Sequence, residues 1–150
     1  MGFPLFDILA RRADLGPQQL AFEDMVSGQQ VTYLELNQRS GQAAALLAGH
    51  GVTYGERVAV LCRNRVEFFE LLFACAKLGA ILVPLNWRMP ARELAPLLAD
   101  CGARWLVHSS EDAVVAAALA DNGCLLLDLD YSGDDGFRHR RDALVPLLGR

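Results

Sequence analysis

Short apolar runs alternate with amphipathic segments along most of the chain. From Gly51 onward, an apolar run is followed three times by a segment whose apolar residues lie three or four apart, and a glycine closes each segment. Runs of Val, Ile and Leu are typical of buried strands, and the wider spacing is typical of helices. This pattern predicts the strands Arg57–Leu61, Ala80–Leu85, Arg104–His108 and Cys124–Leu129, and the helices Val66–Leu78, Pro90–Asp100 and Glu111–Ala120.

The order of these elements predicts the fold class. Strands that are separated by helices pair in parallel, because each helix returns the chain to the same end of the sheet. Each crossover is expected to be right-handed. We therefore predict an α/β fold: a Rossmann-like layer with a mainly parallel sheet covered by helices, over roughly residues 57–129, with its strand order left open.

The preceding part, roughly residues 1–56, is expected to form a helix, a β-hairpin and a second helix. The expected positions are residues 6–13 for the first helix, and Leu20–Glu23 with Gln29–Thr32 for the hairpin. Thr32 and Glu35 have the spacing of a capping box, which begins the second helix. Gly51 can adopt the left-handed conformation that ends it.

The last part, residues 130–150, is expected to be a polar tail. Its spacing predicts a weak helix from Asp142 to Leu148. Arg138, Arg140 and Arg141 lie among aspartates, and we interpret this mixed charge as a solvated surface segment. All 150 residues are thus expected to form one portion of a single domain.

The composition favours a folded, soluble protein. Of the 150 residues, 53% are hydrophobic and 21% are charged, and the formal net charge is −4. A mildly acidic chain gains no attraction to nucleic acid by counterion release, so no nucleic-acid partner is expected. The most apolar stretch, Val66–Trp87, contains two glutamates, a lysine and a proline, so no membrane span is expected either.

The cysteines and the N-terminus indicate a cytoplasmic location. Cys62, Cys75, Cys101 and Cys124 lie in or beside apolar segments and form no C-x-x-C unit. We expect buried thiols in a reducing compartment. The first eight residues lack the basic region that begins a signal peptide.

No pattern of residues predicts a catalytic, metal or phosphate site by itself. The glycines at positions 49, 51 and 55 follow a predicted helix and lack the spacing of a phosphate-binding loop. The acidic run from Asp128 is similar to the start of an EF-hand loop, but its twelfth position is His139, which cannot supply the required carboxylate. Of the three histidines, only His108 ends a predicted strand, where such folds bind ligands.

Four stretches between about Leu5 and His108 carry a family resemblance. They are Val31–Asn37 (VTYLELN), Leu46–Val60 with a Gly-Val and a Gly-Glu-Arg-Val strand, Asn64–Asn86 with Asn-x-x-Glu-Phe and Gly-Ala-x-x-x-Pro-Leu-Asn, and Glu93–Arg104. In this order and spacing they resemble the N-terminal part of the AMP-forming acyl-CoA synthetases, the adenylate-forming AMP-binding superfamily. Glu56 stands where the family usually has aspartate.

The resemblance implies a two-step ligase reaction. In this family a carboxylate attacks the α-phosphate of ATP to give an acyl-adenylate and pyrophosphate, and a thiol, usually that of coenzyme A, then displaces AMP. ATP, Mg²⁺ and coenzyme A are therefore implied for the full-length family, and none is expected to bind tightly to this chain. The implied fold is a large N-terminal domain, here incomplete, followed by a small mobile one.

No catalytic residue of the family carries over to this chain. The family's phosphate loop, hinge and catalytic lysine lie beyond the matched region, and residues 109–150 contain no Thr-Ser-Gly-Thr-Thr-Gly-like run. One binding position does carry over. In some members, a basic residue two after the Pro-Leu-Asn asparagine approaches the coenzyme A nucleotide. That residue is Arg88 here, and a guanidinium suits a phosphate. The alternative for Arg88 is an ordinary surface arginine.

These observations lead to one favoured hypothesis and two alternatives. The favoured one is an N-terminal fragment of an ATP-dependent acyl-CoA synthetase, inactive alone, whose partners are the missing remainder of the enzyme or further copies of itself. Its substrate in the complete enzyme is a carboxylic acid, and fatty, aromatic and short acids all fit. The alternatives are a standalone non-catalytic module that packs on a partner polypeptide, and an unrelated small α/β ligand-binding domain.

Overall fold

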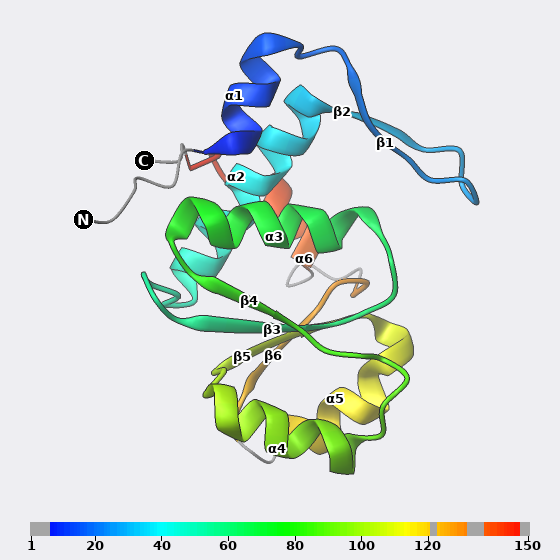
Figure 1. Ribbon diagram of the computed structural model, residues 1–150, viewed down its shortest axis with the longest axis vertical. Helices are drawn as coiled ribbons and strands as arrows, with labels where there is room; N and C mark the ends of the chain where they lie inside the picture. The colour runs from blue at the N-terminus through cyan, green and yellow to red at the C-terminus, as the bar shows by residue number, and fades with distance from the viewer. Residues whose placement is uncertain (1–6, 121–122, 132–136, 148–150) are drawn as a thin grey trace.

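The computed structural model describes residues 7–120, 123–131 and 137–147. A four-stranded sheet lies between two layers of helices, and a small N-terminal unit lies beyond one layer (Figure 1). The elements are α1 Ile8–Leu15, β1 Leu20–Glu23, β2 Gln30–Thr32, α2 Tyr33–Gly49, β3 Arg57–Leu61, α3 Val66–Leu78, β4 Ile81–Pro84, α4 Ala91–Cys101, β5 Trp105–His108, the 3₁₀ turn η1 Ser110–Asp112, α5 Ala113–Ala120, β6 Leu125–Asp128 and α6 Phe137–Asp142.

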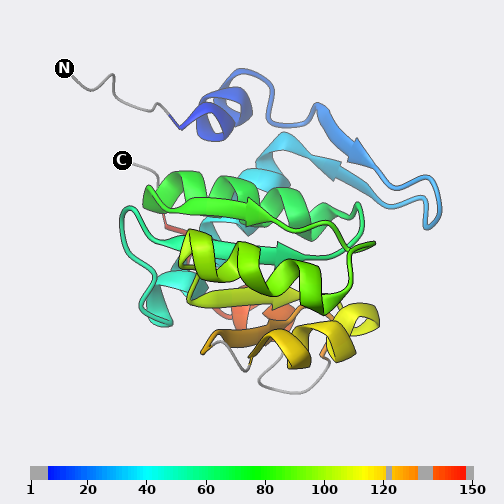
Figure 2. The same cartoon turned by 60° about the horizontal axis from the view of Figure 1, so that its bottom comes forward.

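All four strands of the central sheet run parallel, in the order β4-β3-β5-β6. Figure 2 shows them side by side, with their carboxyl ends at one edge. The central strand β5 is buried at all of its positions. The predicted α/β fold with a mainly parallel sheet is confirmed, and the structure supplies the strand order.

The two faces of the sheet belong to two separate cores. Val58 and Val60 on β3 pack with α2 and α3, and Phe137 of α6 joins this core. The alternate residues Ala59 and Leu61 pack with α4 and α5 on the other face. Because these strands are covered on both faces, their sequences are continuous apolar runs, and these runs were the signal that located them.

Local signals set the ends of the helices. The Thr32 hydroxyl accepts a hydrogen bond from the Glu35 N–H at 3.2 Å, and the Glu35 carboxylate accepts one from the Thr32 N–H at 2.8 Å, which completes the predicted capping box of α2. Gly79 and Gly102 end α3 and α4 with φ of 70° and 66°. Pro90, which we expected inside α4, precedes it as the N-cap, because its ψ of 157° is extended.

Lys77 of α3 links the N-terminal unit, which consists of α1, β1 and β2, to the helices that cover the sheet. Its side chain is 3% exposed and pairs with Asp7, and it also donates to the Asn37 side-chain oxygen at 2.8 Å. Asp7 in turn caps α1 by accepting from the Ala10 N–H at 2.9 Å. The hairpin of β1 and β2 is antiparallel as predicted. The N-terminal unit is therefore held to α2 and α3 by the ion pair of Lys77 and by an apolar cluster that includes Leu9, Leu36 and Phe69.

The C-terminal segment corrects two expectations. Helix α6 ends at Asp142, where we expected a helix to begin; residues 143–147 are not helical, and Leu148 lies outside the described residues. Pro146 lacks an N–H and disfavours a helix there. The arginines also do more than face solvent: Arg141 is 6% exposed and pairs with Glu70, and Arg138 pairs with Glu67. Carboxylates that are buried on α3 require cationic partners, which the sequence pattern did not reveal.

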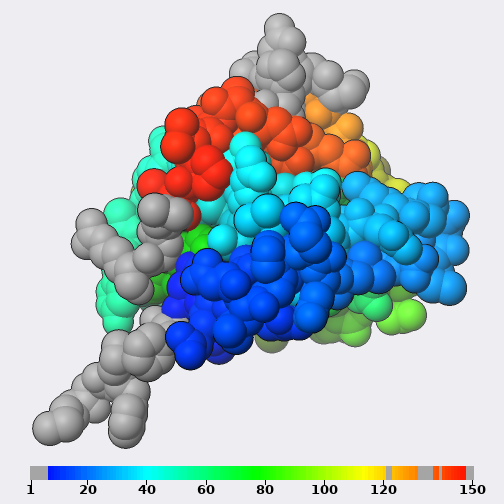
Figure 3. Space-filling view, turned by 90° about the horizontal axis from the view of Figure 1, so that it is seen from above, coloured from blue at the N-terminus to red at the C-terminus, as the bar shows by residue number. Residues whose placement is uncertain are grey.

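The segment after α6 crosses α2 at a glycine. The Leu147 N–H donates to the Gly41 carbonyl at 3.0 Å, and the Gln42 side chain donates to the Leu144 carbonyl at 3.2 Å. A Cβ on Gly41 would lie 2.8 Å from the Leu147 carbonyl oxygen, so a larger residue would displace the segment. Figure 3 shows this red segment beside the cyan α2.

Candidate functional site

The carboxyl edge of the parallel sheet contains a topological switch point. β3 leads into α3 on one face, whereas its neighbour β5 leads through η1 into α5 on the other face (Figure 1). The chain therefore diverges between two adjacent strands, and open α/β sheets leave a crevice for ligands at such a point. The loops that follow β3, β4, β5 and β6 supply the residues of this candidate site.

A network of charged hydrogen bonds fills the middle of this edge. Arg65 donates to the two carboxylate oxygens of Asp130 at 2.9 and 2.6 Å, and to Glu67 at 2.8 Å. Ser110 donates its backbone N–H to Asp130 at 3.0 Å and its hydroxyl to Asp128 at 2.9 Å. These bonds tie together the chain segments that follow β3, β5 and β6.

The network favours the ionised forms of two of its carboxylates, those of Asp130 and Glu67. The hydrogen bonds from Arg65 lower the pKa of Asp130. Burial raises the pKa of Glu67, but the hydrogen bond from Arg65 and the charges of Arg65 and Arg138 outweigh it, so the pKa of Glu67 is also lowered. A carboxylate that is held ionised and saturated with donors is poorly suited to exchange protons with a substrate. We therefore assign this network a structural role.

Two polar clefts flank the network, and neither has a surplus of positive charge. One, of about 410 Å³, is lined by four carboxylates and three arginines, among them Arg63, Arg65 and Asp130. The other, of about 420 Å³, lies between α2, α3 and α6 and is also lined by four carboxylates and three arginines. A phosphate group would meet nearly balanced charge in both clefts, so neither is a strong candidate for nucleotide binding.

The other residues that the sequence raised do not form a site. His108 is buried at the end of β5, where its Nδ1 lies 3.0 Å from the Ser109 carbonyl oxygen, and it lines neither cleft. Asp128 accepts a hydrogen bond from Ser110, and Asp130 accepts one from Arg65. Within residues 7–120, 123–131 and 137–147, no three His, Cys, Asp or Glu side chains gather as metal ligands. In the same residues no helix is long and apolar enough to cross a membrane.

Arg88 lies in a tight turn after β4, where the sequence placed it. The Asn86 side chain accepts from the Arg88 N–H at 3.0 Å, and the Asn86 carbonyl accepts from the Met89 N–H at 2.9 Å. Arg88 is exposed, and among the described residues it has no carboxylate within ion-pairing distance. Its charge is therefore free to meet an anion.

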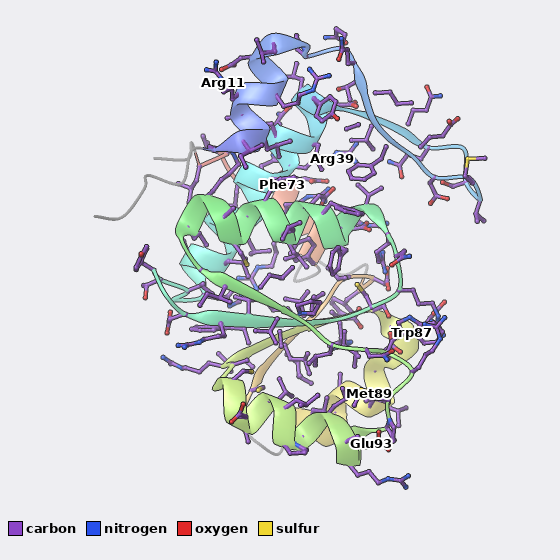
Figure 4. The ribbon with its side chains drawn as sticks, viewed as in Figure 1. Arg11, Arg39, Phe73, Trp87, Met89 and Glu93 are labelled. Carbon is purple, nitrogen blue, oxygen red and sulfur yellow. The ribbon has the colours of Figure 1, made fainter. Side chains whose placement is uncertain are left out.

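Trp87 and Arg63 accompany Arg88 at this edge, and neither was predicted from the sequence as a site residue. The Cζ atoms of Arg88 and Arg63 lie 4.3 and 4.4 Å from the centroid of the Trp87 ring. In Figure 4, Trp87 lies at one end of the sheet, close to the start of α5. Arg63 comes from the loop after β3, so its contact is invisible in the linear sequence. The adjacency of Trp87 and Arg88 was the one available signal.

Comparisons with known proteins match most of the chain to one enzyme family. The family model described as "AMP-binding enzyme" matches residues 9–139. A feruloyl-CoA synthase of an Amycolatopsis species is 41% identical over 128 residues, which are 83% of this chain and 26% of that protein. A long-chain-fatty-acid–CoA ligase of Mycobacterium tuberculosis is 34% identical over 112 residues, which are 75% of this chain and 22% of that protein. The chain thus spans about a quarter of the length of these relatives.

Solved structures agree with the fold. The inhibitor-bound N-terminal domain of FACL13 from Mycobacterium tuberculosis superposes with a TM-score of 0.83 at 28% identity, over 91% of this chain and 35% of that one. A fatty acyl CoA synthetase of the same organism gives 0.80 at 31% identity, over 91% of this chain and 28% of that one. The matched regions correspond to the N-terminal part of these larger proteins.

Proposed function

The chain belongs to the AMP-binding enzyme family, and we propose that it serves as the N-terminal portion of an ATP-dependent acyl-CoA synthetase. In the proposed reaction, a carboxylate oxygen attacks the α-phosphorus of ATP and pyrophosphate leaves. The thiol of coenzyme A then attacks the acyl carbon, and AMP leaves. The observation that carries this proposal is the 41% identity to a feruloyl-CoA synthase across 83% of the chain.

The proposed contribution of this portion is a scaffold. The charged groups at the switch point are engaged with one another, and the buried strands form the central layer of the fold. The described residues offer no set of side chains that fits Mg²⁺, and the sequence has no glycine-rich loop that fits the phosphates of ATP. We therefore assign adenylation to groups outside these residues.

Arg88 is the proposed contact to coenzyme A. An exposed guanidinium with no carboxylate partner among the described residues fits an anionic phosphate, which it can bind through two parallel hydrogen bonds. Arg88 would orient the cofactor by its nucleotide end and take no part in breaking or forming bonds.

The choice of acid is proposed to lie elsewhere in the enzyme. The relatives that match this portion include one named for an aromatic acid and one named for long-chain fatty acids. A portion that is common to such different ligases is expected to support the fold and the shared thiol step. We also propose a cytoplasmic location, which the four free cysteines support.

A chimera tests this proposal. The segment of the Amycolatopsis feruloyl-CoA synthase that matches this chain is replaced by the chain, and feruloyl-CoA formation is followed by absorbance. We expect the chimera to form feruloyl-CoA and to keep ferulate as its acid. The control is the same synthase without the segment, which should be inactive. A chimera that is monodisperse and shows a cooperative thermal transition, yet makes neither adenylate nor thioester, would contradict the proposal.

A further inference from the structure

Arg88 differs from its neighbouring arginines in how its charge is matched. Arg63 pairs with Glu111, and Arg65 pairs with Glu67 and Asp130. For Arg88, the described residues supply no carboxylate, and its guanidinium lies over the Trp87 ring, with Cζ 4.3 Å from the ring centroid. A guanidinium above an aromatic face is attracted by the ring's negative charge density but keeps its own charge. Its N–H donors therefore stay available to an anion.

The Trp87 ring is a fixed support for this guanidinium. The indole is half-buried and packs against the apolar core between the sheet and the helices α4 and α5. The two hydrogen bonds of Asn86, to the N–H groups of Arg88 and Met89, fix the backbone on either side. Packing of the ring and bonding of the turn together limit the orientations that Trp87 can adopt.

Arg63 holds the same ring from another loop. Its Cζ lies 4.4 Å from the ring centroid, and its ion pair with Glu111 joins it to η1. Both guanidinium groups lie over the ring, so Trp87 contacts arginine side chains from two different loops. We infer that the ring orients the arginine side chains beside it. Of the two, Arg63 has a carboxylate partner and Arg88 has none among the described residues.

We propose that Trp87 is a positioning residue, which holds the guanidinium of Arg88 in the orientation that binds a phosphate of coenzyme A. This inference rests on the proposed function. A free arginine side chain has many rotamers and loses them when it binds, whereas one that already lies on a ring loses fewer. An exposed cation–aromatic contact is weak, so loss of the ring face should weaken coenzyme A binding by about 2–5-fold.

The test uses the 150-residue chain and three variants. Trp87→Leu keeps apolar bulk against the core but has no aromatic face, Trp87→Phe keeps a weaker face, and Arg88→Ala removes the guanidinium. Coenzyme A is titrated into each protein while the Arg88 side-chain N–H signal, or in Arg88→Ala the backbone signals of the turn, is followed by NMR. Pantetheine, which lacks the nucleotide phosphates, is the matched control ligand.

We expect coenzyme A, but not pantetheine, to shift the Arg88 signal. The dissociation constant should rise about 2–5-fold in Trp87→Leu and less in Trp87→Phe, and the response should be lost in Arg88→Ala. In the free protein, the ring current of Trp87 should move the Arg88 side-chain protons upfield, and this shift should vanish in Trp87→Leu. A purely structural role would change the melting temperature without changing the dissociation constant of coenzyme A.

Two results would overturn the inference, and they differ in how many of the proposed roles they remove. A folded Trp87→Leu chain that binds coenzyme A as tightly as wild type removes the positioning role alone. A wild-type Arg88 signal that never responds to coenzyme A removes both that role and the assignment of Arg88, whereas the synthetase proposal is judged separately by the activity of the chimera.

Discussion

Glu70 and Arg141 are two oppositely charged residues in the core. They are 1% and 6% exposed, and they join α3 to α6 across 71 positions of sequence. Burial raises the pKa of Glu70, and the charge of Arg141 offsets part of that effect. Arg39 lies farther away, 3.8 Å from the other carboxylate oxygen. Because an unpaired buried charge is costly, we infer that this pair holds α6 against α3.

Removing one partner should therefore destabilise the protein. We expect Arg141→Met to lower the free energy of unfolding by about 3–5 kcal/mol, because Glu70 is left without its main partner. The matched control is Arg140→Met, an exposed neighbour in the same helix, which should change stability by no more than about 0.5 kcal/mol. Urea unfolding followed by circular dichroism measures both.

A compensating double variant tests the cause. Glu70→Leu combined with Arg141→Met removes both charges and should recover most of the loss, since replacing a buried ion pair by apolar residues is often neutral. If the double variant is as unstable as the sum of the two single variants, the ion pair is not what holds α6 in place.

At the scale of elements, the ends of α3 and α4 offer a matched comparison. Both helices end in a glycine with positive φ, at Gly79 and Gly102. A Cβ on Gly102 would have no heavy atom within 4 Å, whereas one on Gly79 would overlap the ring of Tyr54. The two positions therefore share the backbone strain of a substitution but differ in steric room.

This difference predicts unequal costs for the same substitution. Gly102→Ala should lower the free energy of unfolding by about 1–2 kcal/mol, which is the cost of a left-handed conformation with a Cβ. Gly79→Ala should cost more, because Tyr54 must also move. Thermal unfolding compares the two, and Tyr54→Ala in the Gly79→Ala background should bring its cost close to that of Gly102→Ala. Equal costs in the original background would contradict the close contact.

The helices and strands that were predicted differ from the features that were not in how far apart their determining residues lie in the sequence. The four strands, the helices α2 to α4 and the capping box of Thr32 and Glu35 were predicted, because their signals lie within a few residues of one another. The strand order, the position of α6 and the Trp87 contacts depend on groups that are distant in sequence, such as Glu67 with Arg138. Charge alternation near Arg138 looked like a solvated surface because its buried partners are on α3.

In the molecule as a whole, the sheet has two edge strands, β4 and β6, and no strand of the described residues pairs with their outer sides. Apolar side chains are exposed there: Leu125 and Leu126 on β6 are 56% and 37% exposed, and Ile81 on β4 is 47% exposed. An edge strand has unpaired N–H and carbonyl groups, and apolar side chains beside them favour pairing with another chain. We infer that these edges are the main sites of self-association in the isolated chain.

This inference predicts the effect of a charge at the edge. Leu126→Lys should reduce the self-associated fraction of the purified chain, because lysines on edge strands oppose pairing. Leu97→Lys is the control, since Leu97 is similarly exposed, at 48%, but lies on α4. Sedimentation velocity over a range of concentrations measures the association. Equal association of both variants and wild type would mean that β6 is not the contact.

We have proposed that this chain is the scaffold portion of a synthetase whose adenylation groups lie elsewhere. Exchange of labelled pyrophosphate into ATP tests it most directly, with the purified 150-residue chain, Mg²⁺ and fatty, aromatic and short acids. Phosphoryl chemistry on ATP needs backbone donors, cationic side chains and a metal site arranged around the phosphates. We predict no acid-dependent exchange by the chain alone, and ferulate-dependent exchange by the chimera. Acid-dependent exchange by the chain alone would contradict the claim and would mean that these residues contain a nucleotide site.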